Sequence, residues 1–66
     1  MAKTVLVADH NETLRRTLCA ALARESDFEV CAEAHDGRDA IEKAQRLRPD
    51  LIILDLSMPV MNGLVL

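Results

Sequence analysis

Two aspartates, Asp9 and Asp55, each follow a short run of apolar residues and could share one chemical task. The runs, at residues 5–8 and 51–54, are unbroken, which is typical of strands buried on both faces of a parallel sheet. In α/β folds the carboxyl ends of such strands carry the ligand sites. Two carboxylates placed in one crevice repel each other unless a divalent cation lies between them. The pair therefore predicts a site for Mg²⁺, which prefers oxygen ligands.

Asp55 could use this cation for phosphoryl chemistry. A carboxylate that attacks a phosphoryl group forms an acyl phosphate, and a hard cation offsets the negative charge on the transferring oxygens. A second interpretation stays open for each aspartate, because Asp9 could be the N-cap of a following helix and Asp55 could cap a loop or helix without chemistry. His10 is likewise either an exposed loop histidine or a metal ligand.

The elements that would position these residues follow from hydrophobic spacing. Apolar residues recur at helical spacing after Asn11, which suits an N-cap, and this helix should end near residues 24–26. Residues 28–34 alternate between apolar and other side chains, as expected of a strand at the edge of a sheet. A second helix follows the turn signal Asp36-Gly37 and ends at Pro49, before a strand over 51–56. The apolar face of the first helix consists of Leu14, Leu18, Ala21 and Leu22.

This β-α-β-α-β order predicts an α/β fold with a parallel sheet and strand order 2-1-3. Crossover helices of this length join parallel strands through right-handed connections. If the strand 28–34 lies at the edge, the strands that end at Asp9 and Asp55 are neighbours, and the chain leaves them in opposite directions. Such a switch point opens a crevice between two strand ends, so we expect the two carboxylates to meet there.

Composition excludes several classes of function. The 66 residues allow at most one small domain, and the net charge of −3 provides no basic patch for nucleic acid. No apolar stretch is long enough to span a bilayer and the N-terminus lacks a signal peptide, so we expect a cytoplasmic protein without a membrane partner. Cys19 and Cys31 lack the spacing of a metal or redox motif and are expected to be reduced, partly buried thiols.

Residues 55–63 read Asp-Leu-Ser-Met-Pro-Val-Met-Asn-Gly and closely resemble the phosphoacceptor segment of bacterial response-regulator receiver (CheY-like) domains. The resemblance covers nearly the whole chain and implies a flavodoxin-like fold and phosphorelay signalling. It implies that Asp55 accepts a phosphoryl group from a sensor histidine kinase, that Asp9 helps to hold Mg²⁺, and that Ser57 offers its backbone carbonyl to the metal. We therefore expect that the chain is not an enzyme. Residues 28–66 look most like receivers that precede helix-turn-helix DNA-binding domains.

The chain departs from the family pattern in two places. Receivers usually carry two adjacent acidic residues after the first strand, whereas this chain has Asp9-His10. Histidine suits transition metals better than Mg²⁺, so we expect weak Mg²⁺ binding and slow phosphorylation. The sequence also ends at Leu66, from which we expect residues 1–66 to be the N-terminal portion of a receiver without its C-terminal half. The unpaired edge of the last strand would then favour a homo-oligomer.

Two other functions remain open. A degenerate receiver that is never phosphorylated could act as a protein-interaction module, which the pair Asp9-His10 favours. An aspartate-nucleophile phosphatase of the haloacid-dehalogenase type is a more remote alternative, because that family places a second aspartate where this chain has Ser57. Formation of an acyl phosphate on Asp55 separates the receiver from the interaction module, and turnover of a phosphate ester would identify the phosphatase.

Overall fold

The chain alternates strands and helices in the predicted order. In this computed structural model, which describes residues 2–55, the elements are β1 (Lys3–Ala8), α1 (Glu12–Ala23), β2 (Phe28–Ala34), α2 (Gly37–Leu47) and β3 (Leu51–Leu54). The strand predicted over 51–56 ends at Leu54, one residue before Asp55, and residue 56 lies outside the described residues. Neither helix in this range is long and apolar enough to cross a membrane.

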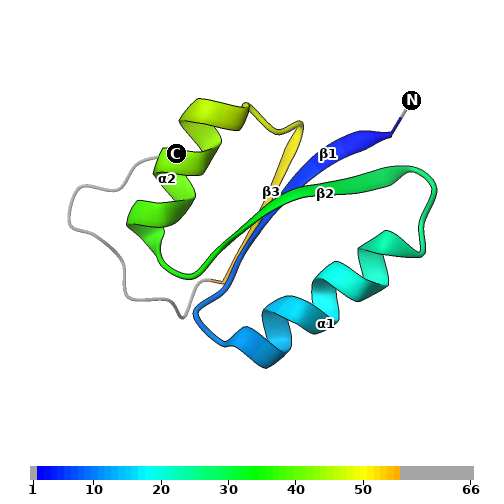
Figure 1. The fold of residues 1–66 in the computed structure, drawn as a ribbon, viewed down its shortest axis with the longest axis horizontal. Helices are drawn as coiled ribbons and strands as arrows, with labels where there is room; N and C mark the ends of the chain where they lie inside the picture. The colour runs from blue at the N-terminus through cyan, green and yellow to red at the C-terminus, as the bar shows by residue number, and fades with distance from the viewer. Residues whose placement is uncertain (1, 56–66) are drawn as a thin grey trace.

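The three strands form one parallel sheet in the order β2-β1-β3, which confirms the predicted strand order. β1 is the central strand, where Val5 pairs with Val30 on one side and with Leu51 on the other. Because the chain leaves β1 and β2 in opposite directions along the sheet, right-handed crossovers place the two helices on opposite faces. Figure 1 shows α1 and α2 on either side of the strands.

β1 supplies the centre of the core. Val5, Leu6 and Val7 are fully buried, because both edges of β1 are paired and a helix covers each face. On one face Leu6 packs in a cluster with Ala34 of β2 and Ala40 of α2. Successive residues of a strand point to opposite faces, so Val5 and Val7 lie toward α1. The core therefore depends on β1 being paired on both sides.

Side chains at both helix starts bond to backbone N–H groups that have no partner within the helix. Asn11 Oδ1 accepts from the Leu14 N–H at 3.1 Å, which confirms the predicted N-cap. Asp36 begins α2 in the same way by accepting from the Asp39 N–H at 2.7 Å. α2 ends at Arg48, which adopts a left-handed conformation with φ of 49°. These caps fix where the chain enters and leaves each helix.

The predicted apolar face of α1 is only partly covered. Leu14 is 54% exposed and Leu18 is 37% exposed, and no residue of α1 is fully buried. α1 packs against β2 and β1, and no further element among residues 2–55 covers the flank that carries these leucines. Apolar spacing thus identified the helix correctly, but it does not determine how much of the face is covered.

A β-bulge changes the environment of Cys31. The pairing of β1 with β2 shifts register after Val5, which leaves Cys31 as the extra residue of β2. Cys31 is exposed, and its thiol contacts the Val5 carbonyl oxygen at 3.4 Å, so the expectation of a partly buried thiol is wrong for this residue. Cys19 is partly buried as expected. This burial raises the pKa of its thiol, and the negative charge of the nearby Glu33 carboxylate raises it further.

Candidate functional site

The backbone places Asp9 and Asp55 side by side at one edge of the sheet. The Asp9 N–H donates to the Ala34 carbonyl and the Asp55 N–H donates to the Ala8 carbonyl, each at 3.0 Å. Each aspartate thus continues the hydrogen-bond ladder by one residue past the end of its strand. Ala8 pairs with Leu54, so the two aspartates leave neighbouring strands at the same level. No enclosed pocket forms there among residues 2–55.

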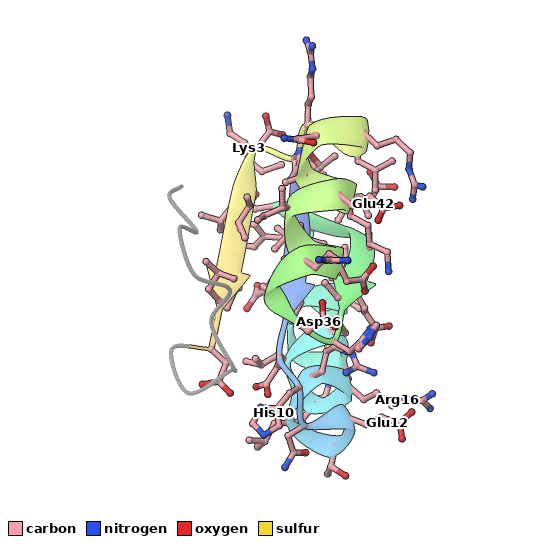
Figure 2. All side chains as sticks on the ribbon, turned by 90° about the vertical axis from the view of Figure 1, so that its left-hand side faces the viewer. Lys3, His10, Glu12, Arg16, Asp36 and Glu42 are labelled. Atoms are coloured by element: carbon pink, nitrogen blue, oxygen red, sulfur yellow. The ribbon has the colours of Figure 1, made fainter. Side chains whose placement is uncertain are left out.

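His10 completes a three-residue cluster with these aspartates. Its Nδ1 lies 3.8 Å from Asp9 Oδ1 and 3.5 Å from Asp55 Oδ2. One ligand atom from each residue lies within 4.8 Å of the other two. The Asp9 side chain is 7% exposed, that of Asp55 24% and that of His10 51%, so the cluster extends from the interior to solvent. Figure 2 shows His10 just beyond the end of β1.

Asp9 is held in place by hydrogen bonds from Asn11, the N-cap of α1, and from Arg15 within α1. Its Oδ1 accepts from the Asn11 N–H at 2.9 Å. Its backbone carbonyl accepts from Arg15 Nη1, also at 2.9 Å, while Arg15 Nε contacts Glu33 Oε1 at 2.9 Å. Apolar spacing along α1 gives no sign of this contact of Arg15. The available signal was its position one helical turn after the N-cap, close to the strand end that carries Asp9.

The donor set decides which metal suits the cluster. Asp9 and Asp55 supply carboxylate oxygens, which fit the Mg²⁺ expected of this pocket. His10 supplies an imidazole nitrogen, which does not fit that ion and suits transition metals. The remaining predicted ligand, the carbonyl of Ser57, lies outside the described residues. Two of the three donors described therefore fit Mg²⁺, and the third favours another class of ion.

A second charged cluster lies at the start of α2. His35 Nδ1 lies 3.0 Å from Asp39 Oδ2, and His35 Nε2 lies 3.2 Å from Asp36 Oδ2. Lys43 joins Asp39 at 3.2 Å and also donates to the Glu33 carbonyl. This cluster ties the first turn of α2 to the end of β2. It is separate from the group of metal-ligand candidates formed by residues 9, 10 and 55.

The chain resembles known proteins in both sequence and fold. A curated relative, the protein-glutamate methylesterase/protein-glutamine glutaminase of Caldanaerobacter subterraneus, is 52% identical over 60 residues, covering 91% of this chain and 16% of the relative. The response regulator domain of Thermotoga maritima CheB matches the structure with a TM-score of 0.87 and 38% identity, over 96% of this chain and 47% of that one. One chain of the crystal structure of the P1 domain of CheA3 in complex with CheY6 from R. sphaeroides matches with a TM-score of 0.87 and 34% identity, over 92% of this chain and 48% of that one.

These relatives correct one expectation from the sequence. The expectation that the chain is not an enzyme is wrong, because relatives from several organisms carry the name of an enzyme, protein-glutamate methylesterase/protein-glutamine glutaminase. The chain spans only 16% of the length of the first two of these relatives.

The family itself follows from the extent of the match. The fold of the CheB response regulator domain, with its parallel sheet and alternating helices, agrees with the predicted flavodoxin-like order. The sequence model of the response regulator receiver domain matches residues 5–66, from the first buried residue of β1 to the last residue of the sequence. This chain therefore belongs to the response regulator receiver domain family, which acts in two-component signalling.

Proposed function

We propose that this chain is a phosphorelay receiver in which Asp55 accepts a phosphoryl group from a sensor histidine kinase. The observation that supports it most directly is the position of Asp55, immediately after β3 and beside Asp9 and His10. The Asp55 side chain is partly exposed, so a phosphodonor can reach it, whereas Asp9 is buried. The resemblance to a complex between CheY6 and the P1 domain of CheA3 supports a kinase partner.

The chemistry of this transfer is a displacement at phosphorus. A carboxylate oxygen of Asp55 forms a bond to phosphorus while the phosphorus–nitrogen bond of a phosphohistidine breaks. The departing imidazole keeps the electron pair of the broken bond and takes up a proton. A bound Mg²⁺ would offset charge on the phosphoryl oxygens. Asp9, Asp55 and the Ser57 carbonyl would hold the ion, and His10 in place of an acid would weaken its binding, so we expect slow transfer.

The test uses acetyl phosphate, a small phosphodonor that needs no partner kinase. In the presence of Mg²⁺ the protein should gain the mass of one phosphoryl group, and hydroxylamine should remove it because it cleaves acyl phosphates. The gain should disappear in Asp55→Asn. Asp27→Asn is the matched control, because Asp27 is an exposed aspartate at the opposite end of the sheet, before β2. Labelling that survives Asp55→Asn would assign the phosphoacceptor elsewhere.

The other outcomes of this test separate the remaining functions. A folded chain that gains no phosphoryl group even at high Mg²⁺ would be an unphosphorylated interaction module, the alternative that His10 in place of an acid favours. Continuous release of phosphate from an ester, dependent on Asp55, would instead identify a phosphatase. Restoring a second acid with His10→Asp should tighten Mg²⁺ binding and speed labelling, since it replaces a poor ligand by a good one.

We also infer that residues 1–66 are the N-terminal part of a receiver joined to an enzymatic output domain. Two features support this inference: the chain matches about half of each solved receiver, and it matches 16% of a protein-glutamate methylesterase/protein-glutamine glutaminase. The full gene product should therefore release methanol from methyl-esterified glutamyl residues, faster after treatment with acetyl phosphate. A product that carries a DNA-binding domain in place of a hydrolase would contradict the inference.

A further inference from the structure

We propose that the cluster of Asp9, His10 and Asp55 binds a borderline transition-metal dication, represented by Zn²⁺, in preference to Mg²⁺. The inference rests on the proposed function only in that it uses the same metal pocket, and it does not require that Asp55 be phosphorylated. It follows from the ligand that His10 contributes: an imidazole nitrogen suits a borderline transition metal, whereas the ion expected of this pocket, Mg²⁺, is hard and prefers oxygen.

The two distances from His10 Nδ1 to the carboxylate oxygens agree with this choice. His10 Nδ1 lies 3.5 Å from Asp55 Oδ2 and 3.8 Å from Asp9 Oδ1, which is longer than a hydrogen bond between nitrogen and oxygen. Two ligands bound tetrahedrally to one Zn²⁺ at about 2.1 Å are separated by about 3.4 Å. Neighbouring ligands of an octahedral Mg²⁺ are closer, at about 2.9 Å. The spacing around His10 Nδ1 is therefore nearer to that of a tetrahedral site.

The charge and burial of the cluster favour a bound dication. Asp9 is 95% buried, since its relative exposure is 5%, and His10 Nδ1 lies 3.8 Å from its carboxylate. A buried carboxylate is costly unless its charge is balanced. With a neutral imidazole, the two carboxylates carry a formal charge of −2, which one divalent ion balances. Asp-His-Asp also leaves a fourth position for water or for a phosphoryl oxygen, as in zinc sites that remain open to ligands.

The backbone around the cluster is already in place. The Asn11 N–H bonds to Asp9 Oδ1, and Arg15 bonds to the Asp9 carbonyl, so the chain on both sides of His10 is fixed before any ion binds. Two of the three ligands are adjacent in sequence, and the third continues the ladder between β1 and β3. Binding would thus require only small rotations of side chains, which keeps its entropic cost low.

The experiment compares metal binding without reference to phosphorylation. Isothermal titration of the protein with each metal should give an affinity for Zn²⁺ at least about 100-fold higher than that for Mg²⁺. Addition of Co²⁺ should produce the visible absorption of a tetrahedral complex. His10→Ala should lower Zn²⁺ affinity about 10-fold or more, and His10→Asp should shift the preference toward Mg²⁺. His10 is half exposed, so its replacement should leave the fold intact, which amide NMR dispersion would verify.

His35→Ala is the matched control, because the ring of His35 also lies between two carboxylates, those of Asp36 and Asp39. Its Zn²⁺ affinity should equal that of the wild type. Equal losses in the two histidine variants, or an unchanged affinity in His10→Ala, would overturn the proposal and leave His10 an exposed loop residue. Zn²⁺ binding through His10 in a chain that acetyl phosphate never labels would reject the phosphorelay function alone, and labelling without Zn²⁺ preference would reject only the present proposal.

Discussion

Arg15 is the residue that connects the candidate site to the rest of the molecule. From α1 it reaches both the carbonyl of Asp9 and the carboxylate of Glu33 on β2, and its side chain is only 13% exposed. A buried charge that has satisfied hydrogen bonds stabilises the arrangement around it, and its removal leaves those partners unsatisfied. Arg15 therefore holds the loop between β1 and α1 against the end of β2.

We predict that Arg15→Ala lowers the free energy of unfolding by about 1–3 kcal/mol. Urea unfolding followed by circular dichroism measures the change. Arg16→Ala is the control, because Arg16 pairs with Glu12 at 3.2 Å but both side chains are largely exposed, as Figure 2 shows. Such an exposed pair is worth at most about 0.5 kcal/mol. Similar losses in the two variants would mean that Arg15 contributes only an ordinary surface contact.

The residues of the site differ in how far sequence alone could place them. Asp9 and Asp55 were predictable as neighbours, because each follows an apolar strand and the strand order brings those ends together. The contacts of Arg15 and His35 were not predictable, since they depend on how far a flexible side chain reaches across two elements. Local spacing determines which face carries a residue, but not which partner it finds.

At the scale of the elements, the start of α2 is fixed by charges that respond to acid. Desolvation acts to raise the pKa of Asp39, but the hydrogen bonds from Lys43 and the His35 N–H and the positive charge of these residues outweigh it. The pKa of Asp39 is therefore lowered from its ordinary value of 3.8. Because the folded state favours the ionised form, Asp39 stabilises the protein above that value and loses this effect as the pH falls through the lower, folded pKa.

We predict that the difference in stability between the wild type and Asp39→Asn is largest near pH 5 within the acid range and shrinks as the pH falls below about 4. Urea unfolding at a series of pH values measures this difference. Working below pH 5 avoids the usual titration range of histidine, which lies higher. Asp27→Asn, an exposed aspartate outside this cluster, serves as the control. A difference that widens toward low pH would have the opposite sign and would contradict the assignment.

The order and type of the elements were largely predictable from the sequence. Unbroken apolar runs gave β1 and β3, alternation gave β2, and the N-cap Asn11 gave the start of α1. The bulge beside Val5 was not predictable, because apolar residues alternate without a break through Val30, Ala32 and Ala34 on either side of the extra residue. The exposure of Leu14 likewise depends on what lies over the helix, which its own periodicity does not reveal.

At the scale of the whole molecule, the sheet has an open side along β3. β3 pairs with β1, and no strand among residues 2–55 pairs with its other edge. Leu51, the first residue of β3, is 43% exposed. Unpaired backbone groups beside exposed apolar residues invite pairing with another chain. We therefore propose that the 66-residue chain self-associates through this edge.

Sedimentation velocity tests this proposal. The average mass of the wild type should rise with concentration, and Leu51→Lys should shift the chain toward monomer because a charge on an edge strand opposes pairing. Leu47→Lys is the control, since Leu47 is similarly exposed, at 41%, but lies on α2. Monomers at every concentration would reject the proposal, and equal dissociation by both variants would assign the contact to apolar surface in general.

The central position of β1 has a consequence for how the protein is made. β1 is synthesised first, yet Val5 pairs with Leu51, 46 residues further along the chain. At about 5–20 residues per second, the ribosome needs about 2–9 seconds to supply that partner. During this interval the most deeply buried strand of the molecule has no complete sheet in which to pack. The nascent chain should therefore bind chaperones through residues 5–8 until β3 has emerged from the ribosome.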